Sequence, residues 1–406
     1  MWQWILENKD MLLIISIPFT SGFIGWFTNM IALKMTFYPI KFWGIPPFLG
    51  WQGIIPRKSY KMAGKAVDML TSKLVKVEEI FDRVEPKQMA SEMSPPVREL
   101  TTDIVNEVGE SSNPQMWQMV PAAVRDGIYS RVNSEVEPLI ETVVKDSKDN
   151  IMEIFDLKQL VIKNLTGDNV RVLNEMFQRC GEKEFKFIEI SGFYFGFLFG
   201  IVQAAIWYFY AQAWTLPLVG VLVGYYTNWL ALKMIFRPHK KKKYLGFIKY
   251  QGLFLKRQKE VSKEYAALVA GKILTAKNIL EAILYGKTAD SIFTMIQKNI
   301  YGALDRIEGF ARPVVSLIVG TNEYDAIRNY IVSKLTAVVP ATVMKVENYM
   351  DQAMDLENTI YSRMSVLPPE DFENLLRTAF QEDEWILISV GAVLGFLVGL
   401  TQALLF

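Results

Sequence analysis

One polar motif occurs twice in this chain, each time within an otherwise apolar stretch. It reads T-N-x-x-A-L-K-M and occupies residues 28–35 and 227–234. Asparagine and lysine are costly in a hydrocarbon layer unless they find partners, so such residues are functional candidates by default. This candidate intramembrane polar site consists of Asn29, Lys34, Asn228 and Lys233. A structural role accounts for the same pattern, because asparagine can bond a neighbouring helix and lysine can extend its ammonium group to the phosphate layer.

A second candidate site follows each motif directly. Segments 40–58 and 240–257 mix aromatic with basic residues. Tryptophan and tyrosine favour the lipid headgroup region, and each basic residue attracts anionic lipid by ~1 kcal/mol. We therefore expect two interfacial or re-entrant hairpins that turn at their Gln-Gly pairs, although plain anchoring explains them more simply than recognition of one headgroup. The candidate lipid-contact residues are Trp43, Trp51, Gln52, Gly53, Arg57, Lys58, Tyr250, Gln251, Gly252, Lys256 and Arg257.

Catalytic signatures are missing from the sequence. It contains no G-x-x-x-x-G-K-[ST] phosphate loop, no H-E-x-x-H zinc motif and no G-x-S-x-G nucleophile elbow. A single cysteine, Cys180, and a single histidine, His239, cannot form a Cys/His metal cluster within one chain, which leaves only carboxylates as metal ligands. We therefore expect no enzymatic activity, no catalytic residue, no metal site and no cofactor.

Four apolar segments are long enough to cross a hydrocarbon core of ~30 Å. They cover residues 11–37, 188–210, 214–236 and 385–406. Hydrophobic residues make up 51% of the chain, which is more than a soluble globular protein usually carries. The sequence therefore predicts an integral, multi-pass membrane protein.

Basic residues predict the orientation of these spans. Two large polar segments, 40–185 and 239–384, lie on one side of the membrane because two spans separate them. Lysine and arginine cluster directly after the first and third spans, with four consecutive lysines at 240–243, whereas the opposite side offers little beyond Lys9. The positive-inside rule then places both polar segments in the cytoplasm and both termini outside.

The chain also repeats itself at a constant offset of 199 residues. G-W-F-T-N-M-I-A-L-K-M-T-F-Y-P at 25–39 falls on G-Y-Y-T-N-W-L-A-L-K-M-I-F-R-P at 224–238, and G-F-L-F-G-I-V-Q-A at 196–204 falls on G-F-L-V-G-L-T-Q-A at 395–403. A single offset over the whole chain indicates a duplication, with repeats at 1–204 and 205–406. Because each repeat has two spans, the repeats run parallel.

Helical spacing and glycines complete the fold prediction. Apolar residues recur at helical spacing between the spans. The fold class is therefore an all-α membrane protein with four transmembrane helices plus two extended cytoplasmic helical domains. Glycines at every fourth position, 192, 196 and 200 and again 391, 395 and 399, predict faces where helices pack closely.

With these motifs in view, the chain resembles a bacterial membrane family called domain of unknown function 445, also known as uncharacterised protein family 0754. The resemblance rests on T-N-x-x-A-L-K-M, on Q-G-x-x-P-R-K at 52–58 and on G-F-L-x-G-x-x-Q at 395–402, and it covers nearly the whole chain. It implies a multi-pass protein of the bacterial inner membrane, from a family without an established activity. The second repeat departs from the first, since Leu255 replaces Pro56 and Lys243 replaces Gly44.

Two classes of function fit these observations best, and a membrane-bound enzyme is a third and weaker hypothesis because no pair of nucleophile and base is found. The leading hypothesis is a non-enzymatic membrane protein that works as a scaffold or handles lipid or another amphiphile. Its expected partners are membrane lipids, anionic headgroups first, together with itself or another protein. Residues 82–150 carry thirteen Asp/Glu against seven Lys/Arg, so we expect no nucleic-acid partner. The alternative is a small oligomeric transporter or channel that uses the paired Asn/Lys of spans one and three.

Overall fold

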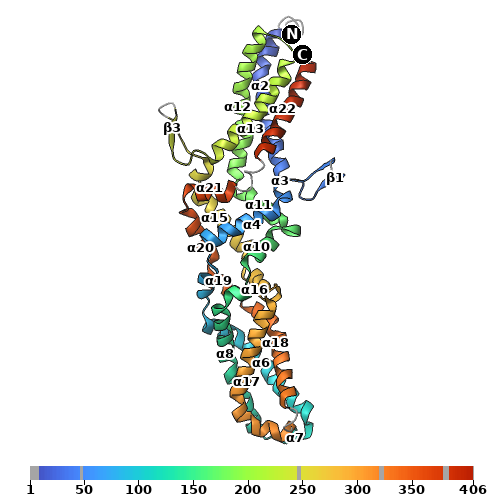
Figure 1. Cartoon of the computed structure of the whole chain (residues 1–406), viewed down its shortest axis with the longest axis vertical. Helices are drawn as coiled ribbons and strands as arrows, with labels where there is room; N and C mark the ends of the chain where they lie inside the picture. The colour runs from blue at the N-terminus through green and yellow to red at the C-terminus, as the bar shows by residue number, and fades with distance from the viewer. Residues whose placement is uncertain (1–8, 46–48, 245–247, 320–323, 378–383, 406) are drawn as a thin grey trace. The chain divides into compact units, whose positions relative to one another are not determined.

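The computed structural model describes residues 9–45, 49–244, 248–319, 324–377 and 384–405. Among these residues, four helices are long and apolar enough to cross a membrane (Figure 1). They are α2 (Lys9–Phe37), α12 (Glu182–Phe209), α13 (Thr215–Phe236) and α22 (Glu384–Leu405). Helices suit such segments because each backbone N–H and C=O group is satisfied within the segment. The predicted all-α class and the four transmembrane helices are thereby confirmed.

The chain forms two compact units, and each unit contains segments of both predicted repeats. The membrane unit consists of residues 1–69, 162–268 and 360–406, and the bundle unit consists of residues 70–161 and 269–359. The central parts of the two predicted helical domains therefore lie together in the bundle unit.

Glycines bring the spans of the membrane unit into close contact. Helix α2 packs along α12, and α13 packs along α22. A Cβ added at Gly25 would lie 2.1 Å from the carbonyl oxygen of Gly192, and one added at Gly224 would lie 2.0 Å from that of Gly391. Only glycine, which has no Cβ atom, lets the two helix backbones approach so closely. The predicted glycine packing faces are therefore confirmed.

A two-stranded antiparallel hairpin follows both α2 and α13. Strand β1 (Trp43–Ile45) pairs with β2 (Leu49–Trp51), and β3 (Lys242–Tyr244) pairs with β4 (Ile248–Tyr250). Short helices then complete the membrane unit: α3 (Ile54–Arg57), α4 (Ser59–Met69), α11 (Val170–Cys180), α14 (Leu253–Lys256), α15 (Gln258–Leu268) and α21 (Pro369–Arg377), with α10 (Leu157–Leu165) and α20 (Leu356–Ser365) crossing the unit boundaries. We call residues 34–58 the first junction and residues 233–257 the second junction.

Long amphipathic helices build the bundle unit. Helices α6 (Pro86–Ser112), α8 (Ala122–Asp149), α17 (Ala289–Val319) and α18 (Tyr324–Val343) lie side by side (Figure 1). Shorter helices join them: α5 (Val77–Asp82), α7 (Pro114–Met119), α9 (Ile151–Ile154), α16 (Ala276–Tyr285) and α19 (Glu347–Met354). Asn113 caps α7 by accepting from the backbone N–H of Met116 at 3.1 Å. A π-helical turn opens each half of the unit, at Leu70–Leu74 and Val269–Ile273.

Candidate functional site

The two asparagines of the repeated motif join neighbouring spans. Asn29 Nδ2 donates to the carbonyl oxygen of Ile188 at 2.7 Å, and Asn228 Nδ2 donates to that of Leu387 at 3.2 Å. Both asparagines are buried, Asn29 completely. Each bond ties the first helix of a pair to the second, so the geometry assigns the asparagines a packing contact between helices.

The two lysines of the motif face away from these asparagines. Lys34 and Lys233 are both exposed, whereas Asn29 and Asn228 point into the helix contacts. Lys233 Nζ lies 4.5 Å from the centre of the Trp229 ring, a cation–π contact on the outer face of α13. The structure therefore does not bring the asparagine and lysine of either motif together into one site.

The Gln-Gly pairs lie at the base of each hairpin, so their predicted place at the turn is wrong. Strand 43–45 pairs with strand 49–51, with Trp43 opposite Trp51, so Gln52 directly follows the second strand. Gln52 Nε2 instead donates to the carbonyl oxygen of Ile40 at 2.9 Å, and the Gly53 N–H donates to that of Pro39 at 2.9 Å. The second hairpin repeats both bonds, from Gln251 to His239 at 3.0 Å and from Gly252 to Pro238 at 3.0 Å.

Glycine is required at the base of the hairpin because the end of the span lies against it. A Cβ at Gly53 would lie 2.7 Å from the carbonyl carbon of Phe37, and one at Gly252 would lie 2.7 Å from that of Phe236. The sequence pattern located this special backbone position correctly but assigned it to a turn. A glutamine side chain that closes a hairpin and a glutamine in a turn look the same in sequence.

One aromatic side chain ties each hairpin to its span. Trp51 Nε1 donates to the carbonyl oxygen of Met35 at 3.1 Å, and Tyr250 Oη donates to that of Met234 at 2.5 Å. These oxygens belong to the last turn of each helix, where carbonyls lack a partner within the helix. Trp43, by contrast, is 76% exposed at the start of β1. Of the predicted aromatic residues, Trp51 and Tyr250 therefore anchor the hairpins, whereas the side chain of Trp43 is exposed.

The predicted basic residues have different surroundings. Arg57 and Lys256 are exposed, and Lys58 is half-buried. Arg257 Nη1 donates to both carboxylate oxygens of Glu184 at 2.7 Å, and its Nε donates to Glu260 at 2.8 Å. Glu184 is only 1% exposed. Arg257 is thus the partner of a buried carboxylate at the start of α12, and loss of Arg257 would leave the charge of Glu184 buried without this partner.

The second junction lines a charged groove, and of the candidate site residues only Lys233 and Tyr250 belong to it. It offers about 1130 Å³ of space, and its lining includes the cations Lys233, Arg237, Lys240 and Lys242. At its side, Glu373 is 5% exposed and accepts from Arg377 Nη1 at 2.9 Å. His239 Nε2 also contacts Glu373, and Arg237 Nε lies 3.8 Å from it.

Sequence comparison of the repeats contained a signal for this groove. At the 199-residue offset, Arg237 stands where the first repeat has Tyr38, and Glu373 stands where it has Asn174. Asn174 Nδ2 donates to the carbonyl oxygen of Phe37 at 2.7 Å. The first repeat thus has a neutral hydrogen bond from Asn174 where the second repeat has the carboxylate of Glu373 with Arg237 and Arg377.

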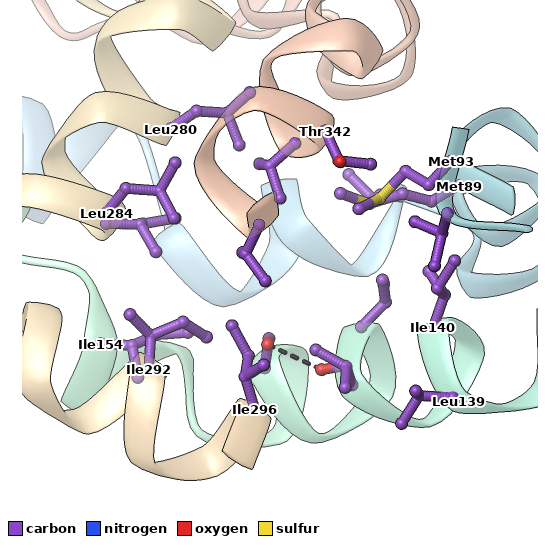
Figure 2. A pocket seen from close by; sticks show the side chains of 18 of the residues that line it. Met89, Met93, Leu139, Ile140, Ile154, Leu280, Leu284, Ile292, Ile296 and Thr342 are labelled. Atoms are coloured by element: carbon purple, nitrogen blue, oxygen red, sulfur yellow. Dashed lines mark hydrogen bonds between the residues drawn. The ribbon is translucent and has the colours of Figure 1, made fainter. Parts of the chain in front are cut away.

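An apolar cavity lies within the bundle unit. It contains about 150 Å³ of space that the centre of a water molecule can reach. Figure 2 shows the side chains that point into it, which come from α6, α8, α9, α16, α17 and α18 and include Met89, Met93, Leu139, Ile140, Ile154, Leu280, Leu284, Ile292 and Ile296. These residues are separated by up to about two hundred positions, so no local pattern could have predicted the cavity.

The few polar lining residues of this cavity already have partners. Ser147 and Thr342 donate from their hydroxyls to carbonyl oxygens one turn earlier, at Val143 and Val338. Lys148 Nζ donates to the carbonyl oxygens of Asp82 at 3.0 Å and Val84 at 2.9 Å. Apart from Lys148, the surface presented to the cavity is consequently apolar, and it fits a hydrocarbon group.

The remaining sulfur and metal chemistry is limited. Cys180 is buried at the end of α11, and burial raises the pKa of its thiol to about 12, with a further contribution from Glu264. A thiol with that pKa is a poor nucleophile at neutral pH. Among the residues that the structure describes, no three His, Cys, Asp or Glu side chains are grouped to hold a metal ion.

Comparison with known proteins shows what the chain is similar to. It is 21% identical to a UPF0754 membrane protein of Microcystis aeruginosa, in an alignment that covers 100% of this chain and 97% of the relative. It is 22% identical to one from Rippkaea orientalis, with 98% and 97% covered. Another, from Gloeothece citriformis, is 26% identical over 43% of this chain and 49% of that protein. No family model and no solved structure matches. The resemblance predicted from the motifs is confirmed.

Proposed function

The chain resembles the membrane proteins of uncharacterised protein family 0754 along its whole length, and on that premise we propose that it is a non-enzymatic protein that handles an amphiphile. The bundle unit takes the hydrocarbon part of this amphiphile in its apolar cavity. That cavity is the single observation that carries the proposal.

The free-energy cost of an empty cavity supports this function. Sealed cavities in protein cores cost ~24 cal/mol per Å³, so about 3–4 kcal/mol is the upper limit for a volume of about 150 Å³ that is partly open. The whole net stability of a domain is only ~5–15 kcal/mol. Empty apolar cavities in proteins bind apolar molecules. A hydrocarbon chain that fills the space therefore recovers a large part of the cost.

Lys148 supports an amphiphile rather than a plain hydrocarbon. It is the one charged residue among the described residues that line the cavity, and it is half-buried. An ammonium group has three N–H donors, and two of them bond the carbonyl oxygens of Asp82 and Val84. The ammonium group of Lys148 can therefore pair with the anionic head of an amphiphile, such as a carboxylate or a phosphate.

The test measures binding of a fluorescent fatty acid to the full chain, purified in mild detergent and stripped of lipid. Val143→Phe puts an extra ring into the cavity, because Val143 lines it from α8. Val124→Phe is the matched control, since Val124 is on the same helix and is exposed. We expect the Kd of the wild type to be micromolar, to rise at least tenfold in Val143→Phe, and to stay unchanged in Val124→Phe.

Two results would refute the proposal. One is that the wild type neither retains lipid through purification nor binds the fluorescent fatty acid. The other is that Val143→Phe, with a melting temperature no lower than that of the wild type, binds it as tightly as the wild type does. Thermal melting of both variants separates a filled cavity from a misfolded bundle.

The proposed location is the bacterial inner membrane, with the polar segments in the cytoplasm. It is supported by the basic residues that follow α2 and α13. In a Cys180→Ala background, Lys41→Cys and Lys240→Cys should be protected from an impermeant maleimide in intact spheroplasts. Gln212→Cys, in the exposed connection between α12 and α13, should react. Reaction of the first two variants and protection of the third would reverse the orientation.

A further inference from the structure

The charged groove lies at the end of a membrane span. Lys233 belongs to the last turn of α13, Arg237 follows that helix directly, and Lys242 is the first residue of β3. Trp229 and Tyr250 add aromatic rings to the lining. Tryptophan and tyrosine gather where a membrane meets water, so this combination places the groove at headgroup depth.

Cations dominate the charge of the lining. Lys233, Arg237, Lys240 and Lys242 line the groove, whereas Glu370 is the one acidic residue of the described lining. The nearby carboxylate of Glu373 is occupied by Arg377 at 2.9 Å and by His239, and its distance to Arg237 Nε is 3.8 Å. Arg237 is 58% exposed, so its guanidinium remains available to a ligand in the groove.

This concentration of charge belongs to the second repeat. The first junction keeps only two of the four lining cations, as Lys34 and Lys41, at the 199-residue offset. Tyr38 stands in place of Arg237, and Trp43 stands in place of Lys242. If the cations served only to attract the protein to acidic membranes, both junctions could carry the same number of them. The unequal number therefore favours a specific site at the second junction.

We infer that this groove binds the phosphate of an anionic phospholipid headgroup. Arginine and lysine provide charge-assisted hydrogen bonds to phosphate oxygens. Leu230 and Met234 add apolar lining on the same helix, where the glycerol ester and the first methylenes of the lipid would lie. A free phosphate ion would use the cations alone and would leave the apolar part of the groove without a function.

This inference does not depend on the cavity of the bundle unit. Its residues all belong to the membrane unit, and the Val143→Phe variant leaves each of them in place. Either binding site can therefore fail its own test without affecting the other.

The experiment uses native mass spectrometry of the full chain in a non-ionic detergent. The protein is titrated with dioleoyl phosphatidylglycerol or with dioleoyl phosphatidylcholine, and the bound lipids are counted. We expect one phosphatidylglycerol to bind at least tenfold more tightly than phosphatidylcholine. Inorganic phosphate, added as a competitor, should displace little of the bound phosphatidylglycerol.

The matched variants are Lys233→Gln/Lys240→Gln and Lys34→Gln/Lys41→Gln. Both remove two exposed charges at equivalent positions of the two repeats. The first pair should weaken phosphatidylglycerol binding at least tenfold and the second pair less than twofold, with melting temperatures unchanged.

Three outcomes would overturn the inference. If both double variants lose phosphatidylglycerol affinity equally, the lipid is held by general attraction to the protein surface. If neither variant loses affinity, the groove is not the binding site. Complete displacement by inorganic phosphate means that a free ion and not a lipid is the ligand.

Discussion

The two junctions share one backbone arrangement but carry different charges. In both, a glutamine side chain closes the base of a hairpin and an aromatic side chain bonds the last turn of the span. Before each junction, an asparagine joins two spans. Only the second has the exposed cations Arg237 and Lys242. The shared contacts are those that hold the chain in place. The differences lie on the surface of a groove, where side chains can change without altering the backbone.

The shared arrangement predicts equal damage when equivalent glycines are replaced. A Cβ at Gly192 would lie 2.3 Å from the carbonyl oxygen of Gly25, and one at Gly391 would lie 2.0 Å from Asn228 Nδ2. Gly192→Val and Gly391→Val should each cost about 3 kcal/mol, because the paired helices must move apart. Denaturation in mixed micelles measures this cost, and Gly127→Val, where no atom lies within 4 Å, is the control. Markedly unequal costs would mean that the two helix pairs pack differently.

The charged contact of the second junction predicts a smaller and unequal effect. Glu373→Ala removes the buried partner of His239 and one of the two carboxylates that Arg377 bonds, which should cost about 2 kcal/mol of unfolding free energy. Asn174→Ala, at the equivalent position, removes one hydrogen bond to the carbonyl oxygen of Phe37 and should cost about 1 kcal/mol. If Asn174→Ala lowered the free energy of unfolding more than Glu373→Ala, the contacts of Glu373 would not be the stronger of the two.

Acid should weaken the second junction through Glu260. Hydrogen bonds from Arg257 and Lys183 lower the pKa of this carboxyl from 4.5 to about 2. A depressed folded-state pKa contributes stability that is complete above about pH 4.5 and is lost as pH falls toward 2. The first repeat has Lys61 at this position and therefore lacks this carboxyl group.

The measurement is the change in melting temperature between pH 5 and pH 2.5 for the wild type and for Glu260→Gln. The variant should show a smaller decrease than the wild type over this range. A decrease of the same size in both proteins would mean that the ion pairs of Glu260 do not affect folding.

The smallest effect concerns a thiol between segments of the two repeats. Cys180 on α11 packs near Tyr265 on α15. Because burial raises the thiol pKa to about 12, less than a few per cent should react with iodoacetamide at pH 8 in an hour. Reaction should become complete in denaturant. Rapid labelling of the native protein would mean that α11 and α15 separate readily in solution.

Local features of the sequence predicted the helical class and the spans well. The uncharged stretch after Glu384 became α22, and the glycines at every fourth position became the helix contacts. These predictions depend on the length and the period of one segment, which do not change when the chain folds. The repeat remains a prediction from the sequence, and equivalent contacts occur in both halves at the same offset.

The candidate sites were predicted less well, because side-chain direction depends on the neighbouring helix. Asn29 and Lys34 are five residues apart on α2, yet one is buried against α12 and the other is exposed. Arg257 looked like a lipid contact until Glu184, from a distant helix, proved to be its partner. The sequence alone does not show which carboxylate pairs with which cation, because Arg257 and Glu184 are far apart along the chain.

By itself, therefore, the sequence determined the membrane class of this protein, the approximate extent of four spans and the positions where two polar motifs recur. The tertiary structure alone decided that Asn29 joins helices, that Gln52 closes a hairpin and that Ile140 and Ile292 border one cavity. The physical reason is that hydrophobic length and period are properties of one segment. Burial, ion pairing and cavities, by contrast, are created only when distant segments pack against each other.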